Sequence, residues 1–229
     1  MKNTKRNLKT CLSLTALLAL GLLLAGCESD STAPNDELPA LTQDGAAQQA
    51  GFVAMAVASV GPEFVTFDGV SKELYTYTFS GSTGISGIVM IDYRDGGSDG
   101  DPATFETGDW AHLWTPEPGG ITGETSAGGS ASLSFDLEAE VTQASDTATI
   151  LVGSSGSFTS GEYTATFDLD TVVVTVASYP SSGTMVFSSG GFVMTVTYDG
   201  DNTAVISVAG VDTWVVNLDD GTLTEIVPV

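Results

Sequence analysis

Most of the chain after residue 70 alternates apolar and polar side chains, as strands with one buried face do. The alternation is unbroken over 131–141, where the even positions carry Ser, Asp or Glu. It recurs over 162–170, and an apolar β-branched stretch follows at 172–176. Further strands are predicted at 73–79, 85–93, 110–114, 147–152, 184–188, 192–198, 204–208, 213–218 and 222–227.

Short turn sequences separate most of the last strands. Gly190-Gly191, the Asp-Gly-Asp-Asn segment at 199–202 and the Asp-Asp-Gly segment at 219–221 are such turns. Connections this short force neighbouring strands to run antiparallel. The pattern therefore predicts a mainly β domain, a single antiparallel β-sandwich or partly closed barrel of about ten strands.

One segment before the strands has helical periodicity. Thr42 or Asp44 can cap its start, and Gly61-Pro62 ends it. The apolar residues at helical spacing are Ala46, Ala50, Val53, Val57 and Val60. We expect one short N-terminal helix packed on the sheet as part of the core.

The first 27 residues contain a basic segment and an apolar segment instead of alternating positions. Four of the six basic residues lie within the first ten positions, and an apolar run over 11–24 follows, interrupted by Ser13 and Thr15. A basic segment before a short apolar segment is typical of a secretory signal. The run is too short to span a membrane, which takes about 20 residues. It ends in Leu24-Ala25-Gly26-Cys27.

These four residues resemble the lipobox of bacterial lipoproteins. The resemblance implies that Cys27 carries lipid, that cleavage before it removes 1–26 as a signal peptide, and that Glu28, in place of Asp, favours the outer membrane. It covers residues 1–27 only. The alternative is an ordinary signal peptide in which Cys27 has no role. The C-terminal strands are similar to segments of uncharacterised bacterial lipoproteins and to no characterised family.

The composition of residues 27–229 limits the functions that this part of the chain can have. Residues 27–40 are predicted to form an acidic flexible tether, and 41–229 a single acidic β-domain. All 29 acidic residues follow Cys27, but only two basic residues do, Lys72 and Arg94. This balance argues against nucleic-acid binding, and it should keep the domain body away from anionic lipid headgroups. One His and two Cys nearly exclude thiol chemistry and Cys/His zinc sites.

An acid-rich loop at 95–106 is the most specific candidate for a metal site. Asp95, Asp99, Asp101 and Glu106 occupy positions 1, 5, 7 and 12 of a twelve-residue segment with Gly at position 6, as in an EF-hand loop. The segment departs from that pattern at positions 3 and 8, and a strand precedes it instead of a helix. It is therefore either a calcium loop between strands or a solvated acidic loop.

Trp110, His112 and Trp114 alternate along one predicted strand and so share a face. If Ala111 and Leu113 point inward, the three rings form an exposed stripe that can stack on sugar rings or other planar ligands. The alternative interpretation places both indoles in the core. Trp214, in a cleanly alternating strand, is predicted to be core.

Asp136, Glu138 and Glu140 project from one face of another strand, about 7 Å apart in succession. Carboxyl pairs at such distances serve glycoside hydrolases, although the order of residues differs from the Glu-x-Asp-x-Glu order of β-sandwich glycosidases. The alternative is an acidic solvent face. A Ser-His-Asp triad would have to use His112, and no Gly-x-Ser-x-Gly motif is present.

The leading hypothesis is a lipid-anchored, exported protein with a non-catalytic structural or binding β-domain. The second is a calcium-assisted binding module for carbohydrate or another ligand. The third is a glycoside hydrolase that uses Asp136, Glu138 and Glu140. A carrier of apolar ligands is a fourth, which no single residue supports. The expected partners of the protein are a membrane, reached through the lipid, and a carbohydrate or protein ligand.

Overall fold

The computed structural model describes residues 40–66, 72–77, 82–95, 98–99, 109–116, 120–125, 129–142, 147–175 and 178–227. Two helices precede the strands, α1 (Gln43–Val60) and the short α2 (Glu63–Thr66). The strands are β1 (Lys72–Tyr77), β2 (Ser82–Asp95), β3 (Ser98–Asp99), β4 (Asp109–Trp114), β5 (Ile121–Thr125), β6 (Ser130–Thr142), β7 (Thr147–Ile150), β8 (Ser155–Ser160), β9 (Tyr163–Thr175), β10 (Ser178–Ser189), β11 (Phe192–Tyr198), β12 (Thr203–Val208), β13 (Val211–Asn217) and β14 (Leu223–Glu225).

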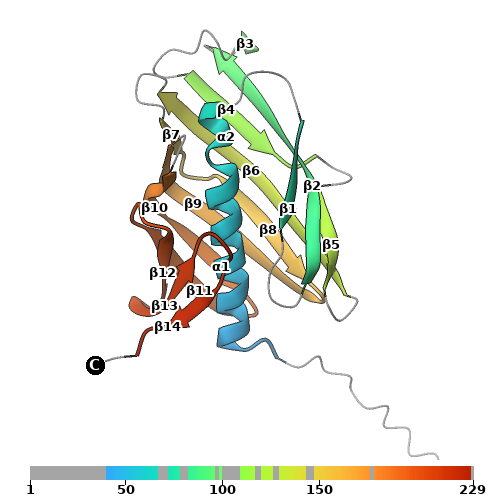
Figure 1. The fold of residues 1–229 in the computed structure, drawn as a ribbon, viewed down its shortest axis with the longest axis vertical. Helices are drawn as coiled ribbons and strands as arrows, with labels where there is room; N and C mark the ends of the chain where they lie inside the picture. Colours follow the sequence, from blue (N-terminus) through green and yellow to red (C-terminus); the bar gives the residue numbers. More distant parts are fainter. Residues whose placement is uncertain are drawn as a thin grey trace, which may run out of the picture. The chain divides into compact units, whose positions relative to one another are not determined.

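The described strands form one antiparallel sheet that curves around α1 (Figure 1). Its main order is β1-β2-β4-β6-β7-β9-β10-β11-β12-β13-β14, and the shorter β5 and β8 each bridge two long strands, β5 pairing with β2 and β6, and β8 with β6 and β9. The prediction of a mainly β, antiparallel domain with one N-terminal helix is confirmed. The strands belong to one continuous sheet and not to the two separate sheets of a sandwich.

Helix α1 has the predicted bounds, and its start is fixed by a side-chain cap. The Oγ1 atom of Thr42 accepts a hydrogen bond from the backbone N–H of Gly45 at 3.1 Å, so Thr42 and not Asp44 is the N-cap. Thirteen of its 18 residues are buried, because β10 to β14 pack along the helix and the sheet curves round it. Gly51 lets the helix come close to the last strands, since a Cβ there would lie 3.1 Å from side-chain carbons of Val216 and Leu223.

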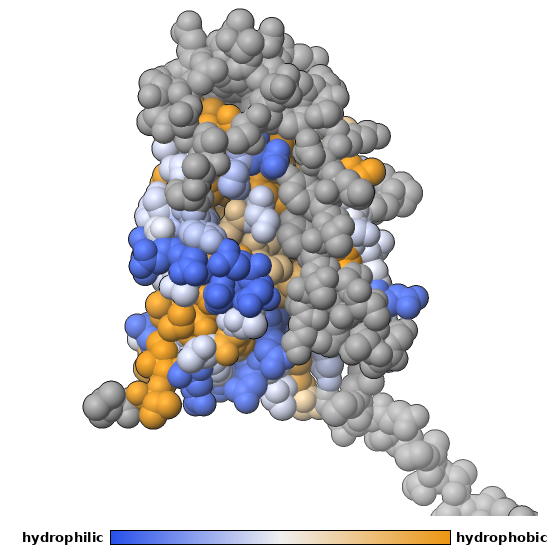
Figure 2. Space-filling view, viewed as in Figure 1, coloured by the Kyte–Doolittle hydropathy of each residue, from blue (hydrophilic) through white to orange (hydrophobic). Residues whose placement is uncertain are grey.

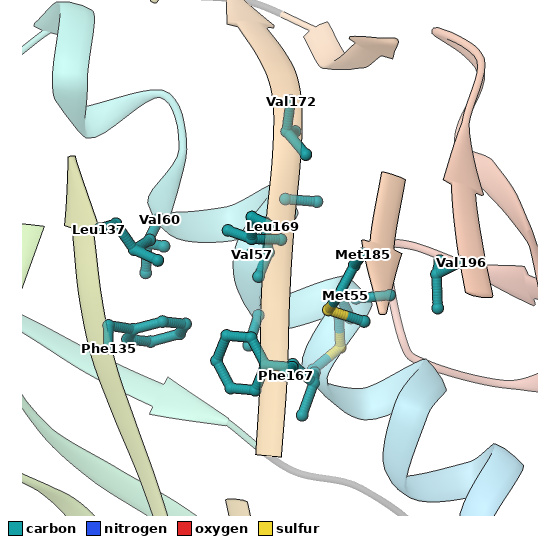
Figure 3. Packing of buried hydrophobic residues seen from close by; sticks show 14 of the residues in the cluster. Met55, Val57, Val60, Phe135, Leu137, Phe167, Leu169, Val172, Met185 and Val196 are labelled. Atoms are coloured by element: carbon teal, nitrogen blue, oxygen red, sulfur yellow. The ribbon is translucent and has the colours of Figure 1, made fainter. Parts of the chain in front are cut away.

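The core fills the space between α1 and the concave face of the sheet (Figure 3). Figure 3 labels Met55, Val57 and Val60 from the helix; Phe135, Leu137, Phe167, Leu169, Val172, Met185 and Val196 come from β6, β9, β10 and β11. Each of these side chains is at most 5% exposed. The inward residues of β6 and β9 are those that the alternation predicted, and Trp214 is buried as predicted. The helix is therefore core material, as expected.

One bulge lets β9 keep its apolar residues inside along its whole length. Thr171 has a positive φ of 54°, and the alternation changes phase there, so that Leu169 and Val172 are both buried. Gly183 on β10 lies opposite this bulge with φ of 114°, and a Cβ there would lie 2.5 Å from the Cα of Val172. The two segments predicted at 162–170 and 172–176 therefore join into one strand.

Candidate functional site

Strand β4 presents His112 and Trp114 on the face opposite the core. Ala111 and Leu113 are fully buried, while His112 and Trp114 are partly exposed. The interpretation that places Trp114 in the core is therefore wrong, because the inward positions of this strand belong to the two smaller aliphatic side chains. For Trp110 only the backbone is described.

The outer face of β4 lies beside the carboxylate row of β6. The register pairs Trp110 with Glu140, His112 with Glu138 and Trp114 with Asp136. Asp136, Glu138 and Glu140 are all exposed, as the interpretation of this row as an acidic solvent face expects. The aromatic stripe and the acidic strand, predicted separately from segments more than 20 residues apart, are thus neighbours on one surface.

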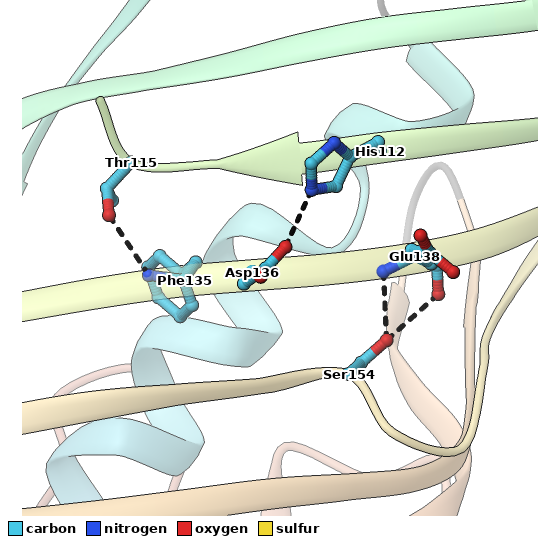
Figure 4. A network of polar contacts seen from close by, with 6 residues as sticks. All are labelled: His112, Thr115, Phe135, Asp136, Glu138 and Ser154. Atoms are coloured by element: carbon cyan, nitrogen blue, oxygen red, sulfur yellow. Dashed lines mark hydrogen bonds and ion pairs between the residues drawn. The ribbon is translucent and has the colours of Figure 1, made fainter. Parts of the chain in front are cut away.

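A hydrogen bond to Asp136 (Figure 4) and a ring contact with Trp114 hold His112 in place. Its Nε2 atom lies 2.6 Å from Oδ1 of Asp136, the diagonal neighbour across the strand pair. Its ring stacks on the indole of Trp114, with centroids 4.8 Å apart and planes 23° apart. The side chain of His112 is 28% exposed and that of Asp136 is 72% exposed. The imidazole and the indole therefore form one ordered aromatic unit that solvent reaches.

Two buried hydroxyl groups fix the backbone of β6 on either side of Asp136 (Figure 4). Thr115 accepts a hydrogen bond from the N–H of Phe135 at 3.2 Å. Ser154 accepts from the N–H of Glu138 at 2.9 Å and donates to the carbonyl oxygen of the same residue at 3.1 Å. Thr115 is 8% exposed and Ser154 is 3% exposed. Sequence reasoning missed both residues, because short polar side chains at strand ends carry no signal of their partners.

The outer face of β4 and β6 combines two kinds of group that can contact a ligand. Aromatic rings offer stacking area, and carboxylates accept hydrogen bonds from hydroxyl or amine donors. Strand β2 borders β4 on its other side, with Asp92 in register with His112 and Arg94 with Trp110. We refer to His112, Trp114, Asp136, Glu138 and Glu140 as the outer platform.

The predicted calcium loop is only partly covered by the described residues. Asp95 and Asp99 lie on β2 and β3, where the register pairs Arg94 with Asp99 and Asp95 with Ser98. Asp101 and Glu106 lie outside the described residues, as does Cys27. Within the part of the chain that the structure describes, no three His, Cys, Asp or Glu residues are grouped so as to hold a metal ion. Calcium binding by the loop therefore stays a prediction.

Two further findings concern membrane-spanning helices and similarity to known proteins. Neither helix in the described ranges combines the length and the hydropathy that crossing a bilayer requires. Comparison of the chain with known protein families, with curated proteins and with solved structures finds no match. Any statement of function therefore depends on the residues themselves.

Proposed function

We propose that the chain is an exported bacterial lipoprotein, anchored through lipid on Cys27 at the outer membrane, whose β-domain binds a ligand without catalysis at the outer platform. The ordered stack of His112 on Trp114, beside three exposed carboxylates, is the observation that carries the binding proposal. The lipobox residues carry the anchoring proposal.

Carbohydrate is the ligand class that this surface suits best. The C–H face of a sugar ring stacks on an aromatic ring, and its hydroxyl groups donate hydrogen bonds to carboxylates. On the outer platform both kinds of group lie on adjacent strands at the spacing of direct and diagonal cross-strand neighbours, about 4.5–8 Å. The buried bonds of Thr115 and Ser154 support an arrangement that exists before the ligand arrives, which reduces the ordering entropy that binding must overcome.

Binding of soluble oligosaccharides to the purified protein tests the proposal. Added oligosaccharide of the matching type should quench tryptophan fluorescence with saturation. The Trp114→Ala variant should lose about tenfold in affinity, equivalent to about 1.4 kcal/mol. Trp114→Phe keeps an aromatic ring and is the matched control, for which we expect a smaller loss.

Two outcomes would contradict the binding proposal. One is that no member of a broad oligosaccharide panel changes the fluorescence. The other is that Trp114→Ala binds as tightly as the unaltered protein, which would place the ligand elsewhere on the domain. Circular dichroism of each variant should show the strand content of the unaltered protein, because Trp114 contributes little to the core.

A further inference from the structure

Two hairpin turns lie at the end of the domain where the chain enters α1. The turn Gly190-Gly191 joins β10 to β11, and the turn Ala209-Gly210 joins β12 to β13. Strands β11 and β12 are paired with Met194 opposite Val208, so the two turns are neighbours. The side chain of Leu41, just before α1, packs so closely on the first turn that a Cβ at Gly190 would lie 2.9 Å from it.

This end carries exposed apolar side chains. Among the described residues the exposed large hydrophobics are Val152, Val186, Val193, Val211 and Val227. Val193 follows the first turn and is 59% exposed, Val211 follows the second turn and is 66% exposed, and Val227 lies just beyond β14 at 75%. Figure 2 shows apolar surface over the C-terminal strands in the lower part of the view. We call Val193, Val211 and the two turns the apolar tip.

Acidic groups flank the apolar tip. Asp212 adjoins Val211 and accepts a hydrogen bond from the hydroxyl of Ser207 at 2.7 Å. Asp44 lies in the first turn of α1, where the helix dipole stabilises a negative charge, and Glu225 ends β14. These charges disfavour an anionic surface at this end. The apolar tip therefore fits an uncharged or zwitterionic surface.

The position at which the chain enters the domain, at Leu41, indicates which surface the apolar tip faces. Thirteen residues, 28–40, separate Cys27 from Leu41, and a tether of that length would span about 20 Å if it is flexible, as the sequence predicts. Helix α1 alone is about 27 Å long, so the end of the domain at Val60 lies about that much farther from Leu41 than the end at Gln43. A lipid on Cys27 would thus hold the end that bears Leu41 nearest to the bilayer. We infer that the apolar tip rests on the zwitterionic lipid surface of the membrane that anchors the chain, an inference that depends on the proposed lipidation of Cys27.

Tryptophan probes in the lipidated full-length product test the contact. Val193→Trp and Val211→Trp place a probe at the apolar tip, and Val152→Trp is the matched control, since Val152 is 74% exposed in the turn between β7 and β8. The proteins are bound to phosphatidylcholine vesicles whose acyl chains carry bromine, which quenches nearby indoles. Apolar side chains at an interface enter about 5–10 Å, so quenching at 193 and 211 should exceed that at 152 at least about twofold. Adding anionic lipid should reduce the difference.

The outcomes separate this inference from the anchoring proposal. Failure of the protein to sediment with vesicles would overturn the anchoring and the contact together. Sedimentation with equal quenching at 152, 193 and 211 would overturn the contact alone. Hydrogen exchange of the unaltered protein provides a measurement free of substitutions. Amides at 190–193 and 208–211 should exchange more slowly on vesicles, and unchanged exchange there would contradict the inference.

Discussion

The contact between Phe52 of α1 and Phe158 of β8 tests whether the helix is an integral part of the core. Both side chains are fully buried, and their ring centroids are 5.0 Å apart with planes tilted by 42°. Aromatic pairs in such an arrangement contribute about 0.5–1.5 kcal/mol beyond the area that they bury. Substitution by Leu keeps most of the apolar volume and removes the contact between rings, at about 1.5 kcal/mol or less for each variant.

A double-mutant cycle isolates the contribution of this pair. The free energy of unfolding of Phe52→Leu, Phe158→Leu and the double variant can be measured in urea, with the fluorescence of the buried Trp214 as the signal. The double variant should be about 0.5–1.5 kcal/mol more stable than the sum of the single losses predicts. A control cycle pairs Phe158→Leu with Ile206→Val on β12 and should be additive. Additivity within about 0.3 kcal/mol for Phe52 and Phe158 would refute the packing of α1 against β8.

Three further outcomes follow from the structure. Gly156→Ala should destabilise the domain by about 2–3 kcal/mol in urea unfolding, because its Cβ would lie 2.2 Å from the carbonyl oxygen of Ser134 and from the ring of Phe167; unchanged stability would contradict the β6–β8 register. The backbone N–H and hydroxyl of Thr222 lower the pKa of Asp220 below its ordinary value of about 3.9. This carboxylate therefore stabilises the fold at pH values above its ordinary pKa, and the stabilisation is lost as the pH falls through the lowered pKa. Asp220→Asn should remove this contribution to the pH dependence of the free energy of unfolding. Identical profiles of unfolding free energy against pH for the variant and the unaltered protein would contradict the role of Asp220. Under the calcium interpretation of the acidic loop, calcium should raise Tm progressively and magnesium should not; a constant Tm would favour a solvated loop.

Local sequence signals predicted the elements whose pattern is long and regular. The bounds of α1 and of β11 agree with the prediction, because a cap, a Gly-Pro stop and flanking turns mark them. Strands β5 and β8 were not predicted. Each has a single buried apolar residue, Ile121 in β5 and Phe158 in β8, which is too little for an alternation to be recognised. They are strands because long neighbours on both sides satisfy their backbone groups.

The outer platform could be predicted only as two unrelated parts. The alternation in β4 and in β6 placed His112 and Asp136 on strand faces, but their hydrogen bond depends on how two strands 24 positions apart pair. Strand β5 pairs with residues 130–133 of β6 and β8 with residues 131–136, so the position of β6 depends on these strands as well as on β4. Long-range pairing of this kind is determined by the whole sheet and leaves no mark in either segment alone.

The mass of the mature protein purified from bacterial membranes shows whether Cys27 begins the chain and carries lipid. We expect a chain that begins at Cys27 and whose first residue carries the added mass of a diacylglyceryl group, with or without a further acyl chain on its amino group. A chain that retains residues 1–26, or an unmodified Cys27 at the start of the mature protein, would contradict it.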